Sequence, residues 1–208
     1  MQQTNQNITD CKSLPVAVQT SVPGLCFYNN VVPDKFHRDF VTQLNQAFYE
    51  HNDGHYDGFS FANDKAFDAV FYPMMQCLFR TMKKLEIFVA APGQQLKLGC
   101  SLIGYEANGH ISRHIDTTTI SGNKVVVFSF GSPCVIHFYQ EDPPHRHEKF
   151  LVPPQSMYIM QDEARYKWSH EILAEENTYQ EKNIGRAKRY SLLLFEPQFA
   201  YREELLEY

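Results

Sequence analysis

The 208-residue sequence lacks the features of several protein classes. Its 19 Lys and Arg residues stand against 24 Asp and Glu, so it has no basic excess of the kind that holds polyanions by bulk charge. Its five cysteines form no Cys-x-x-Cys pair, which excludes a typical disulfide framework or zinc site. No apolar run approaches the roughly 18 residues of a membrane span, and no glycine-rich phosphate loop is present. We therefore expect no membrane partner.

The start of the chain also lacks a basic segment leading into an apolar stretch. We expect no secretory signal there, but a flexible arm over residues 1–21. Hydrophobic residues make up 43% of the chain and charged residues 21%, a balance typical of a globular protein. We expect one domain over residues 22–196 and an acidic tail over residues 197–208. We expect an intracellular monomer, in the cytoplasm or nucleus.

The hydrophobic periodicity changes along the chain from helical to extended. Apolar stripes predict helices over residues 34–48 and 64–88, the second kinked or split at Pro73. The later part predicts eight short strands: Leu96–Ile103, Ile111–Ile115, Val125–Phe130, Cys134–Gln140, Phe150–Val152, Ser156–Met160, Tyr166–Ile172 and Tyr190–Phe195. This order favours an α+β fold, a double-sheet jelly roll with the two N-terminal helices packed on its outer face.

The pattern His-x-Asp occurs three times, and its expected surroundings distinguish the copies. At residues 37–39 it lies in a predicted helix, where side chains two apart diverge by about 200°, so we expect solvated residues. At residues 55–57 it lies in a glycine-rich turn, where a polar turn is the favoured interpretation. His114 and Asp116 end a predicted strand, whose alternate residues share a face. This last pair can approach one metal ion.

A third ligand must come from a distant strand, and His170 is the candidate. A return strand can bring His170 beside His114. His145 and His147 lie in a proline-rich loop, and His137 lies in an apolar strand where a satisfied core histidine is the alternative. Two histidines and one aspartate on one face of a metal form the triad that suits non-haem Fe(II), and leave positions for a co-substrate and dioxygen.

A dicarboxylate co-substrate such as 2-oxoglutarate would also need a cation for its distal carboxylate. Arginine binds a carboxylate bidentately through its planar fork. Arg189 opens the last predicted strand, and Ser191 lies on the same strand face, where it can donate a second hydrogen bond. For Arg189 taken alone, a surface cation at a strand edge is the alternative.

The ordered set of motifs resembles the AlkB family of Fe(II)- and 2-oxoglutarate-dependent dioxygenases. The segments similar to the family's motifs are Tyr105–Asp116, Val127–Ser132, Ala164–Ile172 and Arg189–Ser191. The resemblance implies a double-stranded β-helix. It implies His114, Asp116 and His170 as iron ligands, and Arg189, Tyr105 and Ser191 as residues that bind 2-oxoglutarate.

The resemblance also implies an activity. Dioxygen would oxidise 2-oxoglutarate to succinate and CO2 while a C–H bond of the substrate is hydroxylated, with demethylation when that carbon is a methyl on nitrogen. We expect a modified base in DNA or RNA as the substrate, because the family mostly oxidises methylated bases. The residues of these motifs are similar to those of family members that hydroxylate a tRNA wobble uridine. The cations that could rim a groove for nucleic acid are Arg146, Lys149, Arg165, Lys167, Lys182, Arg186, Lys188 and Arg189.

Other functions stay open at this point. They are an oxygenase acting on a protein or small molecule, a non-catalytic metal-binding jelly-roll module, and a zinc hydrolase. Two positions also depart from the family's pattern. Phe195 stands where many members have a second arginine, and Ile103 stands where asparagine is frequent. Both changes remove polar groups near the expected co-substrate.

Overall fold

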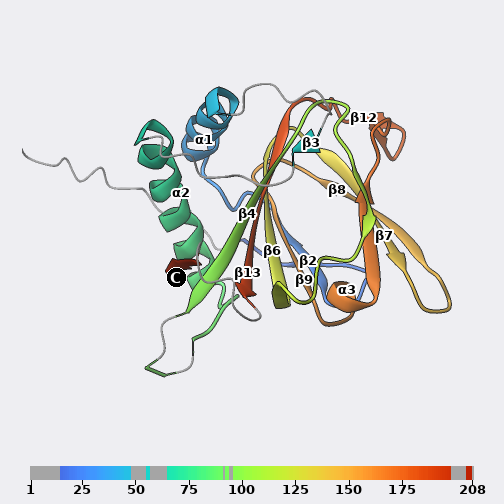
Figure 1. Cartoon of the computed structure of the whole chain (residues 1–208). Helices are drawn as coiled ribbons and strands as arrows, with labels where there is room; N and C mark the ends of the chain where they lie inside the picture. The colour runs from blue at the N-terminus through green and yellow to red at the C-terminus, as the bar shows by residue number, and fades with distance from the viewer. Residues whose placement is uncertain are drawn as a thin grey trace, which may run out of the picture.

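Two β-sheets face each other, and two helices cover the outer face of the larger sheet (Figure 1). The structure is a computed structural model that describes residues 15–47, 55–56, 65–90, 92–93, 96–197 and 205–207. The covering helices are α1 (Asp34–Ala47) and α2 (Lys65–Lys84). In the described part of the chain, no helix is long and apolar enough to cross a membrane. Asp57, of the second His-x-Asp pair, lies outside the described residues.

The larger sheet contains the long central strands. Its order is β1 (Val18–Gln19), β2 (Leu25–Tyr28), β9 (Met157–Gln161), β6 (Ser121–Gly131), β13 (Arg189–Pro197), β4 (Lys97–Tyr105) and β14 (Leu205–Glu207), with β3 (His55–Tyr56) also on β4. The smaller sheet has the order β5 (Ile111–His114), β10 (Trp168–Ile172), β7 (Cys134–Gln140) and β8 (His147–Val152). The remaining elements are α3 (Asp162–Tyr166), β11 (Thr178–Tyr179) and β12 (Lys182–Asn183).

Strand β6 shows why the larger sheet is apolar on both faces. Alternate residues of a strand point to opposite faces. Val126 and Phe128 therefore join the core beneath the helices, whereas Val125 and Val127 join the core between the sheets. All four are buried. The continuous apolar run of β6 thus serves two cores at once.

The helices cover the sheet with the apolar stripes that the sequence predicts. Phe40 and Leu44 of α1 are four residues apart, and Met74, Leu78 and Met82 of α2 repeat the same spacing, so each set lies on one helix face. All five side chains are fully buried in the first core. The expected split at Pro73 is wrong, because α2 continues through that residue as one helix.

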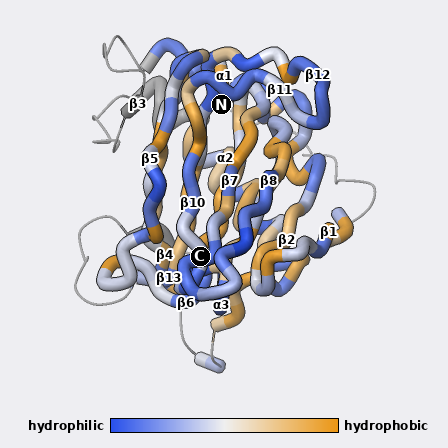
Figure 2. The backbone as a smooth tube through the Cα atoms, turned by 90° about the vertical axis from the view of Figure 1, so that its right-hand side faces the viewer, coloured by the Kyte–Doolittle hydropathy of each residue, from blue (hydrophilic) through white to orange (hydrophobic). Residues whose placement is uncertain are grey.

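The smaller sheet has one apolar face and one polar face. Phe138 and Trp168 point into the core between the sheets. Figure 2 views β5, β10, β7 and β8 from the outer side. Along β10, Trp168 and Ile172 join the core between the sheets, whereas Ser169 and Glu171 are polar and do not. Such a division is typical of an antiparallel sheet that covers a core on one side only. It leaves the inner face of β5 and β10 to form the wall of a site.

The eight predicted strands correspond to β4–β10 and β13. Strand β10 begins later than predicted, because Tyr166 closes α3. Short pairings also extend the larger sheet at both ends: β1 pairs with β2 in the expected N-terminal arm, and β14 pairs with β4 in the expected acidic tail.

Candidate metal and co-substrate site

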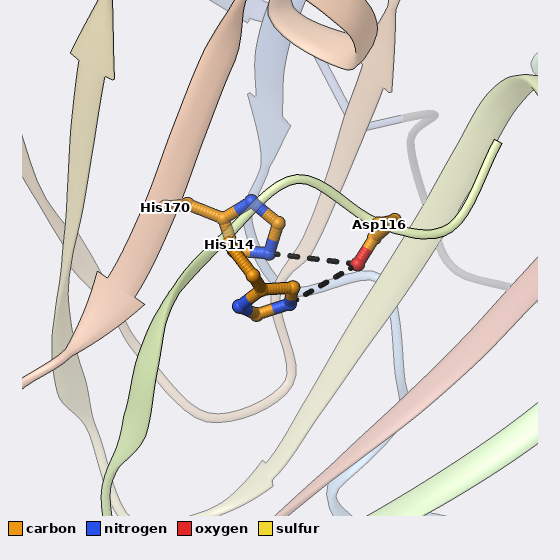
Figure 3. A group of neighbouring side chains, drawn as sticks. All are labelled: His114, Asp116 and His170. Carbon is orange, nitrogen blue, oxygen red and sulfur yellow. Dashed lines mark ion pairs between the residues drawn. The ribbon is translucent and has the colours of Figure 1, made fainter.

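The structure brings His114, Asp116 and His170 together at the inner face of the smaller sheet (Figure 3). His114 ends β5 and is the register partner of His170 in β10, while Asp116 follows β5 by two residues. Nε2 of His114 lies 3.3 Å from Oδ1 of Asp116, and Nε2 of His170 lies 3.7 Å from the same oxygen. One ligand atom of each residue lies within 4.8 Å of the other two. Such a cluster can surround a single metal ion.

A hydrogen bond orients His114, and burial and charged contacts set the protonation of His170 and Asp116. Nδ1 of His114 lies 2.7 Å from the carbonyl oxygen of Ser112, which can only accept, so Nδ1 carries a proton and Nε2 is the nitrogen that faces Asp116. Burial lowers the pKa of His170 to about 4, so this imidazole is neutral. Burial also raises the pKa of Asp116, but contacts with His114 and His170 outweigh it and leave the pKa below its usual value. Asp116 is therefore a carboxylate.

The second carboxylate oxygen of Asp116 is an unsatisfied hydrogen-bond acceptor. Oδ2 is buried and has no hydrogen-bond partner among the described residues. A buried carboxylate oxygen left without a partner is destabilising, and native proteins rarely leave one. A bound cation would satisfy it. The donor set of two imidazoles and one carboxylate, with this orphaned oxygen, therefore fits Fe(II).

Arg189 is a buried cation at the start of β13, a central strand between β6 and β4. Its side chain is 1% exposed, so the alternative of a surface cation at a strand edge is wrong. Nη2 donates to the hydroxyls of Ser191, at 2.9 Å, and Ser129, at 3.3 Å. The guanidinium lies 4.8 Å from the ring centroid of Tyr105. The structure thus assembles the three residues expected to bind 2-oxoglutarate and adds Ser129.

Two donors of Arg189 point to a missing anion. Within the described part of the chain, Nε and Nη1 are buried without hydrogen-bond partners. A buried guanidinium with unpaired donors is costly unless a ligand completes it. The Nε–H and Nη1–H groups lie on different sides of the guanidinium, and each can donate a charge-assisted hydrogen bond to a carboxylate oxygen. Arg189 therefore fits the distal carboxylate of a dicarboxylate such as 2-oxoglutarate.

A cavity between the sheets is lined by the His114–Asp116–His170 triad. Its hydroxyl-bearing lining residues are Tyr105, Tyr158 and Ser191, of which Tyr105 and Ser191 contact Arg189. Its remaining lining is apolar: Ile103, Ile111, Val127, Ile136, Met160, Ile172 and Leu193. Polar groups at defined points on an apolar wall are typical of a small-molecule site.

Tyr158 is the lining residue that the sequence analysis missed. Burial raises its pKa well above the usual value, so its hydroxyl stays protonated and can donate a hydrogen bond. Tyr158 is the register partner of Val127 in the β6–β9 ladder. Tyr158 and Met160 both join the core between the sheets. The alternation within the predicted strand over residues 156–160 was the available signal, because it puts Tyr158 on a single face with Met160.

The two departures from the family's pattern have structural counterparts. Ile103 forms part of the apolar cavity wall. Phe195 is the register partner of Gly99 and covers it so closely that a Cβ added at Gly99 would lie 2.3 Å from the Phe195 ring. An aromatic ring packed on a glycine thus occupies the position where many AlkB proteins have a second arginine.

Two other histidines are explained by structure. The expectation of a solvated His37 is wrong: Nε2 of His37 accepts a 3.0 Å hydrogen bond from the backbone N–H of Gly131, and the ring stacks on Phe130. His137 is the satisfied core histidine of the alternative interpretation. It is buried, with Nδ1 3.0 Å from Nε2 of His147 and its other nitrogen against Glu176.

Most of the cations expected to rim a groove have partners inside the protein. Arg165 and Arg189 are buried. Four others lie within 2.8 to 3.5 Å of carboxylates, in the pairs Arg146–Glu148, Lys149–Glu176, Lys167–Glu163 and Lys188–Glu106. Arg186 donates to the backbone carbonyls of Gly109 and Ala174. Acidic neighbours therefore neutralise much of the charge that the sequence offered for nucleic acid.

Comparison with known proteins identifies related sequences. The family model described as the 2OG-Fe(II) oxygenase superfamily matches residues 24–194. The mitochondrial alpha-ketoglutarate-dependent dioxygenase alkB homolog 7 of Bos taurus is 31% identical over 113 residues, 54% of this chain and 51% of the bovine protein. The Mus musculus protein of the same name is 26% identical over 172 residues, 82% of this chain and 75% of the mouse protein. The match thus spans about half the length of the bovine relative.

Solved structures share the fold. A Trichoplax adhaerens prolyl hydroxylase, in complex with a peptide of hypoxia inducible factor, superposes with a TM-score of 0.54 at 14% identity and covers 83% of this chain and 84% of its own. A Pseudomonas putida prolyl-4-hydroxylase superposes with a TM-score of 0.51 at 13% identity, covering 85% and 89%. At such identity the likeness concerns the fold, and it confirms the predicted jelly roll.

The family match covers most of the chain, and both AlkB relatives agree with it. The resemblance to AlkB proteins, the oxidoreductase class and the expected Fe(II), 2-oxoglutarate and dioxygen are thereby confirmed at the level of the family. The same match favours an oxygenase over a zinc hydrolase or a non-catalytic module. The chain belongs to the 2OG-Fe(II) oxygenase superfamily.

Proposed function

We propose that this chain is an Fe(II)- and 2-oxoglutarate-dependent dioxygenase that hydroxylates a C–H bond of its substrate. His114, Asp116 and His170 would hold the metal, and Arg189 the distal carboxylate of 2-oxoglutarate. The observation that carries the proposal is that polar atoms of both signs are buried without hydrogen-bond partners: a carboxylate oxygen of Asp116 and two donors of Arg189. The first calls for a cation and the second for an anion.

Different residues of the site would bind the metal, bind the co-substrate and exclude water. When bound, Fe(II) supplies the activation of dioxygen, with 2-oxoglutarate leaving as succinate and CO2. The triad would supply three ligands to the metal, so that the co-substrate and dioxygen could also bind there. Ser191 and Tyr158 line the cavity and can donate hydrogen bonds to the co-substrate. The apolar wall excludes water, which strengthens these polar contacts.

An anaerobic binding experiment tests this function. Protein loaded with Fe(II) should develop a weak visible absorption band when 2-oxoglutarate is added, and should release succinate when air is admitted. His114→Ala should lose both signals. His110→Ala, which removes an exposed histidine just before β5, is the matched control and should keep them. A wild-type protein without a co-substrate-dependent band, or an unchanged band in His114→Ala, would contradict the proposal.

For the prime substrate, we propose first a modified base in DNA or RNA. The resemblance to AlkB proteins supports this class, and a base would have to leave its stack to reach the cavity. A protein or small-molecule substrate is the second candidate, and a specific observation favours it. The ion pairs Lys149–Glu176 and Lys188–Glu106 neutralise cations that would otherwise attract a polyanion.

A succinate-release screen separates the two candidates. Iron-loaded protein is incubated with 2-oxoglutarate and with pools of methylated DNA, methylated RNA, tRNA or methylated peptides. Stimulation by a nucleic-acid pool that weakens steeply with added salt is the expected result for a modified base. Stimulation by peptides alone would overturn that preference and support the second candidate.

The location of the protein in the cell is a separate part of the proposal. The bovine and mouse relatives carry mitochondrial names, whereas the sequence led us to expect the cytoplasm or nucleus. We propose an intracellular protein and take mitochondria as the second candidate location. Cell fractionation with antibodies against this chain distinguishes the compartments, and recovery in the mitochondrial fraction alone would overturn the cytoplasmic or nuclear expectation.

A further inference from the structure

Arg165 is a buried charge that the proposed mechanism does not use. It lies in α3, and its side chain is 1% exposed. Unlike most buried arginines, it has no carboxylate among the hydrogen-bond acceptors described for it; the acceptors are backbone carbonyls and one hydroxyl. Burying a guanidinium costs several kcal/mol unless its donors are satisfied. The position of these acceptors therefore indicates what the buried charge achieves.

The acceptors belong to the segment that links β5 to β6 and to the first two residues of β6. Nη1 of Arg165 donates to the carbonyl of Asp116 at 2.8 Å, and Nε donates to the carbonyl of Gly122 at 3.2 Å. Nη2 donates to Ser121, to its carbonyl at 3.0 Å and to its hydroxyl at 2.7 Å. One planar fork thus spans both ends of the segment. A lysine, with a single ammonium, cannot reproduce this span.

Asp116 depends on this fork because it lies beyond the last residue of β5. Ladder hydrogen bonds hold His114, but Asp116 is not part of a strand. Of the backbone hydrogen bonds described, the only one to Asp116 comes from Arg165. The carboxylate of Asp116 is thus aimed by a backbone that Arg165 anchors.

Arg165 also connects two ligands that come from different parts of the chain. Helix α3 ends at Tyr166, and β10 begins at Trp168, two residues before His170. The backbone N–H of Lys167 bonds to the carbonyl of Glu163, which closes α3 immediately before β10. The unit of α3 and β10 therefore carries His170 and, through the guanidinium, the backbone of Asp116.

We infer that Arg165 is a positioning residue for the metal site: it locks the backbone of Asp116 to the α3–β10 unit, so that the carboxylate meets His170. The inference rests on the proposed function, because it presumes a metal at the triad. Outer contacts of this kind change metal affinity by about 10- to 100-fold when they are removed.

Arg186 provides a matched control. It is a second, partly buried arginine whose guanidinium donates to backbone carbonyls, those of Gly109, Leu173, Ala174 and Glu176. None of these carbonyls belongs to a residue of the triad. Arg186→Met should therefore reduce stability through the same kind of loss as Arg165→Met, without releasing a metal ligand.

The experiment measures Co(II) binding without turnover. Wild type, Arg165→Met, Arg165→Lys and Arg186→Met are titrated with Co(II), and the visible spectrum of bound Co(II) and the urea midpoint of the metal-free protein are recorded. We expect Arg165→Met to raise the Co(II) Kd at least about tenfold and to change the spectrum. Arg165→Lys should be intermediate, and Arg186→Met should keep the Kd within about threefold and the spectrum unchanged.

Each outcome bears on one proposal. If wild type does not bind Co(II), the proposed function fails. If wild type binds but both Arg165 variants keep its Kd and spectrum, the positioning role is overturned while the proposed function stands. An equal loss of affinity in Arg186→Met would also overturn it, because the effect would then follow general destabilisation. If Arg165→Met does not fold, Arg165→Lys, which keeps the charge, carries the same comparison.

Discussion

His114 and His170 face each other as register partners in the β5–β10 ladder, with their ring centroids 4.4 Å apart. The ladder is irregular beyond them, since the next pair joins Ile172 to Ile111. Irregularities of this kind re-aim side chains and are frequent beside active sites. The separation of the two imidazoles is thus set by strand pairing, and the two histidines should respond differently to substitution because their burial differs.

Removing either histidine should abolish tight metal binding. His114→Ala and His170→Ala should each raise the Co(II) Kd by about 100-fold or more, beyond the effect of losing an outer contact. Their stabilities should differ. The His170 side chain is 9% exposed and its ring packs 5.6 Å from Phe138, so its loss should cost about 2 kcal/mol of unfolding free energy. The His114 side chain is 32% exposed, and its loss should cost less. Metal titration and urea unfolding check both, and wild-type affinity in His170→Ala would contradict the assignment.

Arg189→Met should separate co-substrate binding from metal binding. Loss of two charge-assisted hydrogen bonds, about 3 kcal/mol together, corresponds to a roughly 100-fold rise in the Kd for 2-oxoglutarate. The Co(II) Kd should change little. Without ligand, the variant should be as stable as wild type or more so, because two unpaired buried donors disappear. Calorimetric titration of 2-oxoglutarate into metal-loaded protein measures the first effect. An unchanged Kd would remove Arg189 from the site.

Gly99→Ala should destabilise the larger sheet through Phe195. The added methyl would lie 2.3 Å from the Phe195 ring, which must then move out of its packing. We expect a loss of about 2 kcal/mol in wild type and of less than about 1 kcal/mol when Phe195→Leu has already made room. Urea unfolding of the four proteins in this double-mutant cycle gives the coupling. Equal losses in both backgrounds would show that the clash is relieved elsewhere.

The hydrogen bond from Gly131 to His37 should make stability depend on pH. Burial lowers the pKa of His37; Asp34 raises it and Arg38 lowers it further. The folded protein therefore keeps this imidazole neutral at a pH where the unfolded chain protonates it. The unfolded state then binds more protons, so the stability from this group is present above the ordinary histidine pKa of about 6.5 and is lost as the pH falls below it toward the lowered pKa of the folded protein.

His37→Gln tests this dependence, because a glutamine oxygen can accept the same hydrogen bond but does not titrate. Unfolding free energies are measured in a chelator at pH 7.5 and pH 5. Wild type should lose more stability on acidification than the variant does. Other histidines, such as His147, titrate in both proteins and cancel in the difference. Equal losses of stability in the two proteins would contradict the prediction that protonation of His37 destabilises the fold.

Local patterns along the chain were enough to predict much of the architecture. The stripes of α1 and α2 and the alternation in the long strands come from neighbours three, four or two residues apart, so the periods of 3.6 and 2 are visible in the sequence. The same period indicated that Ser191 shares a strand face with Arg189. The order of the motifs along the chain indicated the family to which the chain belongs.

Contacts between distant strands could not be predicted from these periods. Ser129 reaches Arg189 because β6 and β13 pair in a register that places Ser129 opposite Ser191. Tyr158 enters the cavity because β9 pairs with β6. A shift of one residue would turn either side chain to the opposite face, and periodicity carries no information on the register between strands.

The sequence by itself determined most of the helices and strands, the chemical types of the candidate metal ligands and the family to which the chain belongs. Only the tertiary structure decided how the charges are used. Arg165 and Arg189 look like surface cations in the sequence, but the sheets bury both, one satisfied by carbonyls and one with two donors unpaired. The physical reason is that burial and hydrogen bonding depend on which segments meet in space, whereas composition counts only charges.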